Sequence, residues 1–225
     1  VLAAVQDQPH LYVVAGLSYL DFRPAHLEEL EPHIETGKLR GLKLYPGYQP
    51  FYPSDPIWEP AYAFAAKHKI PVMIHSGDTY APTGKVKYSH PIHVDETAVD
   101  HPDVKFVICH VGNPWIRDCM EVVYKNDNVY TDISGFVLGS FSYRFERYMR
   151  KQVEEILLYG VEPEDVLYGT DWPIASMETY IEFMDQISIP QKERKKIMGE
   201  NALDLYGIDP ATSLFEAHRN GARSK

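Results

Sequence analysis

The sequence predicts an α/β fold built around a parallel sheet, and two observations support this prediction. Six short segments rich in Val, Ile, Leu and Tyr recur along the 225 residues, and a helical stretch follows each of them. The segments are densely apolar rather than strictly alternating, as expected for parallel strands that are covered on both faces. The predicted strands are residues 11–17, 41–45, 71–75, 104–110, 129–133 and 166–170.

The polar residues at the ends of these strands are spaced like the repeats of an eight-stranded α/β barrel. Lys43 and His75 are 32 positions apart, His75 and His110 are 35 apart, and Asp132 and Asp171 are 39 apart. A barrel of about 250 residues has about 31 residues for each strand and helix. Because ligands bind at the carboxyl ends of the strands in such folds, these residues are candidates for a site.

The stretches between the strands include two clear helical patterns and two long loops. Residues 56–69 and 178–187 place apolar side chains three and four positions apart, which predicts amphipathic helices. Residues 48–60 and 77–91 are predicted loops that follow strands on the side of the candidate site. Loops of this length in a compact domain are commonly lids or substrate walls.

The composition is that of a globular protein with an acidic balance. Apolar residues make up 44%, which allows a sizeable core, so we expect one barrel domain over residues 1–208 and a polar tail that frays over residues 209–225. The net charge of −10 and the lack of a basic block make nucleic acid an unexpected partner. No apolar stretch approaches the roughly 18 residues of a membrane span and no signal peptide is recognisable, so we expect a cytoplasmic protein.

Four residues at the strand ends have the types found in metal hydrolases: Lys43, His75, His110 and Asp171. Neutral imidazoles and a carboxylate suit zinc or a similar divalent ion, and a catalytic site needs about three protein ligands and an open position. Each residue taken alone could be a polar side chain that caps its strand. Because all four follow strands at the same end of the fold, we favour a shared site.

The strand-end motifs together resemble one known group of enzymes. GLKLYPGYQPFYP, PVMIHSGD, VKFVICHVGNPW, NVYTDISG, VLYGTDWP and GENALDLYGI are similar to the amidohydrolase-related superfamily, and to its branch with aminocarboxymuconate semialdehyde decarboxylase-like enzymes. The resemblance implies a TIM (β/α)8 barrel with strands 3–8 in this chain. It also implies His75 as a metal ligand on strand five, His110 as the strand-six histidine that binds the metal or acts on the substrate, and Asp171 as the strand-eight aspartate.

Two features leave this resemblance incomplete. The His-x-His pair that supplies two metal ligands on strand one of the family does not occur in the 225 residues. We therefore expect strands 1 and 2 to be missing, about 60 residues at the usual repeat length, from either a truncated or a degenerate chain. Lys43 occupies the strand-four position, where it is either a carbamylated bridging lysine, as in some binuclear relatives, or a plain lysine against a substrate carboxylate.

Several weaker signals concern the neighbourhood of this site. His90 and His93 are interpreted as capping or substrate-contacting residues rather than metal ligands. Cys109 beside His110 is not expected to form a catalytic dyad, since adjacent strand residues point to opposite faces.

Other residues at the strand ends and the second cysteine are assigned with alternatives left open. Asp132 could hold a ligand histidine or only cap its strand. Tyr45 and Trp172 could wall a pocket for a flat or aromatic substrate. Cys119 and Cys109 have no disulfide or zinc-binding spacing, so both are expected to be reduced and buried.

Three functions are compatible with these residues. The first is a metal-dependent hydrolase in which a divalent ion, zinc before manganese or iron, activates water toward an amide, ester or lactone. Asp171 would accept the proton of this water, and His110 would polarise the carbonyl group. The second is non-oxidative decarboxylation of an aromatic or dienoic acid on the same site. The third is a metal-free ligand-binding scaffold. A small-molecule substrate is expected in the first two cases, and a homo-oligomer is left open.

Overall fold

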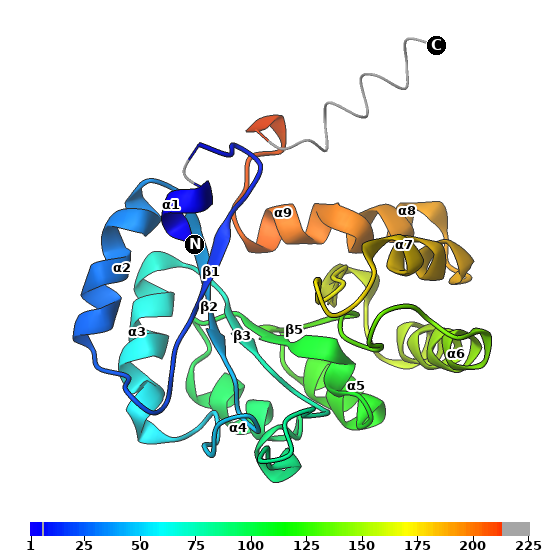
Figure 1. The fold of residues 1–225 in the computed structure, drawn as a ribbon, viewed down its shortest axis with the longest axis horizontal. Coiled ribbons are helices and arrows are strands. Elements are labelled where there is room, and N and C mark those ends of the chain that lie inside the picture. Colours follow the sequence, from blue (N-terminus) through cyan, green and yellow to red (C-terminus); the bar gives the residue numbers. More distant parts are fainter. Residues whose placement is uncertain (6, 213–225) are drawn as a thin grey trace.

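A six-stranded parallel sheet forms the centre of the computed structural model, which describes residues 1–5 and 7–212 (Figure 1). The strands follow one another across the sheet in chain order, from β1 to β6, and all neighbouring pairs are parallel. The six predicted strands are therefore confirmed. Five of them are shorter than predicted, and the strand predicted over residues 41–45 begins two residues earlier and is one residue longer. The observed strands are β1 Val13–Gly16, β2 Leu39–Leu44, β3 Val72–Ile74, β4 Phe106–Ile108, β5 Val129–Asp132 and β6 Val166–Leu167.

Helices alternate with the strands, as the sequence predicts. The predicted helix over residues 56–69 is a 3₁₀ turn, Pro56–Trp58, that leads directly into α3. The predicted helix over residues 178–187 is α7, which begins one residue earlier where Ser176 accepts a hydrogen bond from the amide of Thr179. The helices are α1 Leu2–Val5, α2 Ala25–Glu35, α3 Glu59–His68, α4 His93–Asp100, α5 Ile116–Lys125, α6 Tyr143–Tyr159, α7 Met177–Gln186, α8 Gln191–Lys195 and α9 Asn201–Leu205.

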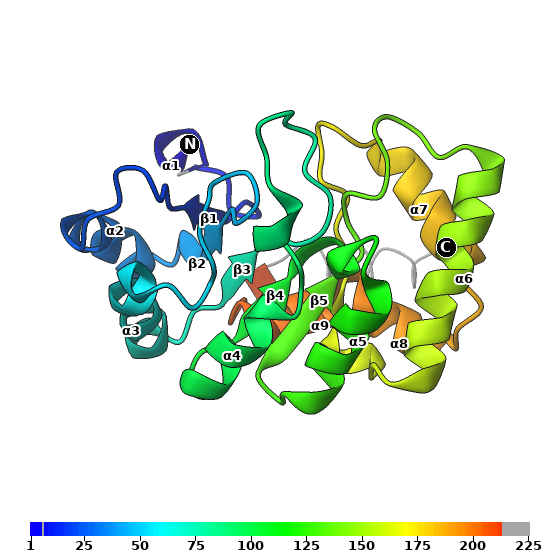
Figure 2. The same cartoon turned by 90° about the horizontal axis from the view of Figure 1, so that it is seen from below.

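The sheet is packed on both faces, and the two faces differ. Helices α2 to α6 follow one another around its outer side, where they cover the main core (Figures 1 and 2). The short helix α9 contributes to a smaller cluster on the opposite, inner face. Strand residues of the outer core include Leu42, Leu44, Val72, Ile74, Phe106, Ile108 and Val166. The inner cluster joins Met73, Val107, Tyr130 and Leu167 to Ala202, Leu205 and Tyr206.

Both cysteines are free and buried, as predicted. Among residues 1–5 and 7–212, none of the helices is long and apolar enough to cross a membrane. The predicted polar tail covers residues 209–225, and residues 213–225 of it lie outside the described residues.

The loop after β5 is fixed from α7 by one buried hydrogen bond. The amide of Phe136 donates to the hydroxyl of Tyr180 at 2.6 Å, and Tyr180 is fully buried. A buried amide that loses its partner costs about 1–3 kcal/mol. This bond therefore holds the loop segment that carries the residues following Asp132.

Replacing Tyr180 with Phe is expected to lower the free energy of unfolding by about 1–3 kcal/mol, because the amide of Phe136 stays buried without an acceptor. The measurement is urea unfolding followed by circular dichroism. Tyr159→Phe on α6 is the matched control, since that side chain is 78% exposed, and its effect should stay below about 0.5 kcal/mol. Equal effects of the two substitutions would contradict the role given to Tyr180.

Candidate active site

Two adjoining cavities lie at the carboxyl ends of the strands, and three predicted site residues line both of them. The first cavity has a volume of 270 Å³ and the second 240 Å³. Lys43, His110 and Asp171 belong to both walls, and His75 belongs to the first. The structure therefore brings the four strand-end residues of the sequence analysis to one place.

Tyrosines make up much of the wall of the first cavity. Tyr45 lines it, as predicted for a substrate wall, together with Tyr48 and Tyr80. The loop that carries Tyr80 is joined to the loop after β2, since the amide of Tyr80 donates to the hydroxyl of Tyr48 at 3.3 Å. The two long loops predicted as substrate walls thus meet over this cavity. Its remaining lining residues are Ser76, Asp78, Asn113, Gly135 and Ile174.

The position of His110 depends on an unusual backbone conformation. β4 ends at Ile108, and His110 and Val111 then adopt left-handed conformations with φ of 64° and 45°. A bulky residue in this region is uncommon and needs support from its surroundings. The strand alternation expected for Cys109 and His110 does not apply, because β4 has already ended at Ile108. Both residues line the second cavity, and their described hydrogen bonds go to different partners.

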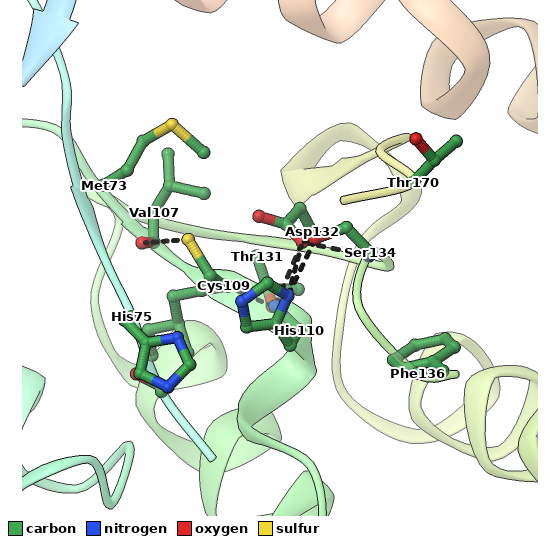
Figure 3. A network of polar contacts seen from close by, with 12 residues as sticks. Met73, His75, Val107, Cys109, His110, Thr131, Asp132, Ser134, Phe136 and Thr170 are labelled. Carbon is green, nitrogen blue, oxygen red and sulfur yellow. Dashed lines mark hydrogen bonds and ion pairs between the residues drawn. The ribbon is translucent and has the colours of Figure 1, made fainter. Parts of the chain in front are cut away.

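The carboxylate of Asp132 supports this conformation. Its Oδ1 atom accepts hydrogen bonds from the backbone amides of His110 and Ser134, both at 3.0 Å, and from the Ser134 hydroxyl at 2.5 Å (Figure 3). The same hydroxyl lies 2.8 Å from Nδ1 of His110. Of the two interpretations of Asp132, the structure favours the residue that holds a histidine over the simple strand cap.

Nearby charges and hydrogen bonds favour the ionised form of Asp132, and burial favours the neutral form of both histidines. Burial would raise the pKa of Asp132, but His110, Lys43 and the Ser134 hydroxyl outweigh it and the pKa is lowered. Burial lowers the pKa of His110 despite the nearby Asp132. Burial also lowers the pKa of His75 well below its usual range, helped by His110 and Lys43. Two neutral imidazoles therefore face a region that already contains an ammonium and a carboxylate.

Lys43 is a half-buried cation whose described hydrogen bond goes to a weak acceptor. Its Nζ atom donates to Sγ of Cys109 at 2.6 Å and lies 5.4 Å from the centre of the Tyr45 ring. Burial would lower the pKa of Lys43, but Cys109 and Asp132 outweigh it and the pKa is raised. Within the described residues, no carboxylate forms an ion pair with its ammonium. An ammonium has three donors, so the cavity keeps hydrogen-bonding capacity for an anion.

His75 is held by its own loop. Its Nε2 atom donates to the carbonyl oxygen of Asp78 at 3.0 Å, and its ring packs against the rings of Tyr48 and His110 at 4.7 and 5.2 Å between centroids. Nε2 therefore carries the proton, which leaves Nδ1 as the atom with a lone pair. Only 5% of the residue is exposed, so this orientation is fixed by packing.

Asp171 and Trp172 follow β6 in an exposed turn. Asp171 has a left-handed conformation with φ of 65° and lines both cavities. Trp172 is 64% exposed and is absent from the described linings of the two cavities, so its contact with substrate stays a prediction.

His90 and His93 lie apart from the cavities in the part of the chain that the structure describes. His90 packs on the ring of Trp115, and Nε2 of His93 donates to the carbonyl oxygen of Lys87 at 2.8 Å. These contacts are local, and the capping or substrate-contacting roles interpreted from the sequence stay predictions.

The donor set for a metal is chemically suitable but incomplete. His75, His110 and Asp171 offer the nitrogen and oxygen donors that zinc or manganese takes. Among the described residues, however, no three His, Cys, Asp or Glu side chains are grouped closely enough to hold an ion. These residues therefore do not compose a metal site by themselves, and ligation by the three remains a prediction.

The sequence analysis did not assign a role to Ser134 and Gly135, although both lie in the motif NVYTDISG. A Cβ atom on Gly135 would lie 2.4 Å from Nδ1 of His110, and Gly135 has a φ of 69°. The glycine after a strand-end Asp and Ser was a usable signal for a close approach. The sequence pattern could not show that the residue close to Gly135 is His110.

Comparison with known proteins assigns the fold and the family. A family profile described as Amidohydrolase matches residues 1–208. Gamma-resorcylate decarboxylase of Rhodococcus jostii (strain RHA1) is 24% identical over 196 residues, with 72% of this chain and 58% of that protein covered. Gamma-resorcylate decarboxylase of Rhizobium sp. (strain MTP-10005) is 22% identical over 206 residues, with 73% and 59% covered. The chain thus spans less than two thirds of the length of these relatives.

Solved structures confirm the TIM-barrel prediction. An uncharacterised TIM-barrel protein from Bordetella bronchiseptica has a TM-score of 0.73 at 22% identity, with 92% of this chain and 70% of that chain covered. A dihydroxybenzoic acid decarboxylase from Polaromonas sp. JS666, solved with manganese and 2-nitroresorcinol, has a TM-score of 0.67 at 18% identity, covering 92% and 72%. A probable 2-pyrone-4,6-dicarboxylic acid hydrolase from Acinetobacter baumannii has a TM-score of 0.68 at 18% identity, covering 92% and 77%.

Replacing Gly135 with Ala is expected to displace the His110 ring, because the new methyl group would overlap Nδ1. We expect a loss of about 1–3 kcal/mol in the free energy of unfolding and a shift of the His110 ring resonances in NMR spectra. Gly139→Ala is a matched control, since its φ is 74° and a Cβ atom there meets nothing within 4 Å. If both variants lose the same stability and leave the His110 resonances in place, the close approach has no consequence.

Proposed function

The chain belongs to the amidohydrolase family, and we propose from this that it forms a large part of the active site of an enzyme that acts on a small, flat, carboxylated substrate. The reaction we favour is non-oxidative decarboxylation of a hydroxylated aromatic acid. The observation that carries this proposal is Lys43, a half-buried ammonium with spare donors in a cavity walled by tyrosines. The two curated relatives, both named as decarboxylases of an aromatic acid, support the same reaction.

Lys43, Tyr45 and Tyr48 bind the substrate in this proposal. The ammonium of Lys43 donates charged hydrogen bonds to the carboxylate, and these bonds are stronger than those between neutral groups. The tyrosine rings flank the plane of the substrate, since aromatic rings pack favourably in offset or tilted arrangements. The walls contributed by the two long loops then keep water away from the carboxylate.

His110 and Asp171 move protons in this proposal. The neutral ring of His110 accepts the proton of a substrate hydroxyl next to the carboxylate, which makes the ring carbon more electron-rich. Asp171 takes a proton from solvent and passes it to this carbon. The bond between the carbon and the carboxylate then breaks, its electron pair restores the aromatic ring, and carbon dioxide leaves. The proton held by His110 returns to the ring oxygen, so one solvent proton is consumed for each carbon dioxide released. Both residues line the two cavities, so both are within the same enclosed space.

Hydrolysis, the first hypothesis from the sequence, remains a second candidate on the same residues. The likeness to a probable 2-pyrone-4,6-dicarboxylic acid hydrolase, a protein named for a flat dicarboxylic lactone-type compound, supports it. In that case His110 or Asp171 would take a proton from water instead of a substrate hydroxyl. A divalent ion, for which zinc is the prediction and manganese the ion of one solved neighbour, would lower the pKa of that water when bound. Because the described donor set is incomplete, the proton transfers above do not depend on it.

The test is incubation of the purified protein with 2,6-dihydroxybenzoate and, separately, with 2-pyrone-4,6-dicarboxylate, in water enriched in ¹⁸O. Decarboxylation predicts one carbon dioxide for each 2,6-dihydroxybenzoate consumed, with no ¹⁸O in the aromatic product. Hydrolysis of the pyrone with ¹⁸O in the product would instead support the second candidate. No turnover of either compound, with or without added zinc or manganese, would contradict both.

Lys43→Met is expected to lower kcat/KM for the carboxylated substrate by about 10- to 150-fold, the range for hydrogen bonds to charged groups. The thermal midpoint should not fall, because the substitution removes a half-buried charge and keeps an apolar stem of similar length. Lys67→Met is the control, since Lys67 is an exposed partner of Glu31 on α2 and should leave kcat/KM unchanged. Equal kcat/KM for Lys43→Met and the unmodified protein would remove Lys43 from the site.

A further inference from the structure

We propose that Ser134 and Asp132 act together as a positioning pair that fixes His110 in the tautomer with its proton on Nδ1. The pair does not touch the substrate, and it acts through the imidazole ring. The tautomer itself follows from the hydrogen bonds described above. Only its consequence for turnover rests on the proposed function, in which His110 accepts a proton.

The direction of the hydrogen bonds follows from the number of hydrogens available. The carboxylate of Asp132 can only accept, so the hydroxyl of Ser134 donates its single hydrogen to Oδ1 at 2.5 Å. The Ser134 oxygen is then only an acceptor toward Nδ1 of His110, which lies 2.8 Å away. Nδ1 must therefore carry the ring proton, and Nε2 of the neutral ring keeps its lone pair.

The hydroxyl is needed because the carboxylate does not reach the ring. Nδ1 of His110 lies 3.9 Å from Oδ1 of Asp132, which is too long for a hydrogen bond. Ser134 fills this gap, and Figure 3 shows its side chain beside Asp132 with the His110 ring on the near side. A carboxylate bonded directly to a histidine stabilises the protonated ring. The Ser134 hydroxyl, placed between the carboxylate and the ring, still fixes the orientation of the ring. It does not stabilise the protonated ring as a directly bonded carboxylate would.

The pair is itself held in place by the backbone. Oδ1 of Asp132 also accepts the amides of His110 and Ser134, so the acceptor cannot turn away without losing both. Asp132 is 4% and Ser134 6% exposed, so water does not compete for these bonds. The backbone of Gly135 also lies close to the ring, since a Cβ atom there would be 2.4 Å from Nδ1. The ring therefore has one orientation, with Nε2 directed away from Ser134.

The test is the tautomer of His110, read from two-bond ¹⁵N–¹H correlation spectra of the protein labelled at histidine nitrogens. The unmodified protein should show Nδ1–H in at least tenfold excess over Nε2–H, a ratio that one hydrogen bond to a charged network can supply. The spectra are recorded before and after treatment with a chelator, so that an ion bound at Nε2 is not the cause. An Nε2–H tautomer in the chelated unmodified protein would overturn the proposal, even if every variant failed to fold.

Three variants separate positioning from stability. Ser134→Ala should lose the excess of the Nδ1–H tautomer, and Ser134→Thr, which keeps a hydroxyl, should restore it. Ser89→Ala is the matched control, because Ser89 is a buried serine whose hydroxyl donates to the carbonyl oxygen of Gly77 at 2.6 Å. It should lower stability without changing the tautomer. A Ser134→Ala protein that keeps the Nδ1–H excess would overturn the proposal.

Activity gives a second and independent measurement. If His110 accepts a proton during turnover, Ser134→Ala should lower kcat by about 10- to 100-fold with little change in KM, as expected for a loss in the transition state. A protein that turns over neither test compound contradicts the proposed function and leaves the tautomer measurement unaffected. A Ser134→Ala protein with the altered tautomer and unchanged kcat would instead show that the tautomer does not limit the reaction.

Discussion

One carboxylate joins the two strand ends on which the candidate site depends. Asp132 ends β5, and its Oδ1 atom accepts the amide of His110 from the turn after β4 and the amide and hydroxyl of Ser134 from its own loop. Without it, the amide of His110 at the start of the left-handed turn would lose its acceptor. The ionised state of Asp132 is in turn favoured by Lys43 from β2. Three strands thus contribute to the geometry of one imidazole ring.

The fold could be predicted because its signals are local and repeated. All six predicted strands occur, and the helix expected over residues 178–187 was placed within one residue. The strand ends were less well predicted. Residues 104–110 were read as a strand to His110, whereas β4 ends at Ile108. The apolar run VKFVIC continues the strand pattern beyond that point, and only the distant carboxylate of Asp132 makes the turn favourable. Such a contact, 22 positions away, leaves no periodic trace in the sequence.

The sequence predicted which strand-end residues lie at the cavities, but it did not predict the contacts between them. Lys43, His75, His110 and Asp171 were expected together because parallel strands present their carboxyl ends to one side, and they line the two cavities. The contact of Lys43 with Cys109 and the bridging place of Ser134 were not expected. Both contacts depend on the register of neighbouring strands and on side-chain rotamers. Residue types alone specify neither the register nor the rotamers.

The balance of charge in the cavity bears on what the site can bind. Both imidazoles are kept neutral by burial, and the hydrogen bonds of Asp132 are directed to His110 and Ser134, so its charge is turned toward the protein. Lys43 differs, since its described hydrogen bond goes to a thiol, which is a poor acceptor for an ammonium. An anion bound beside Lys43 would replace the hydrogen bonds to water that the ammonium loses on burial. In the proposed reaction a carboxylate supplies that anion, and its loss as carbon dioxide, with uptake of one proton, returns the cavity to its initial charge.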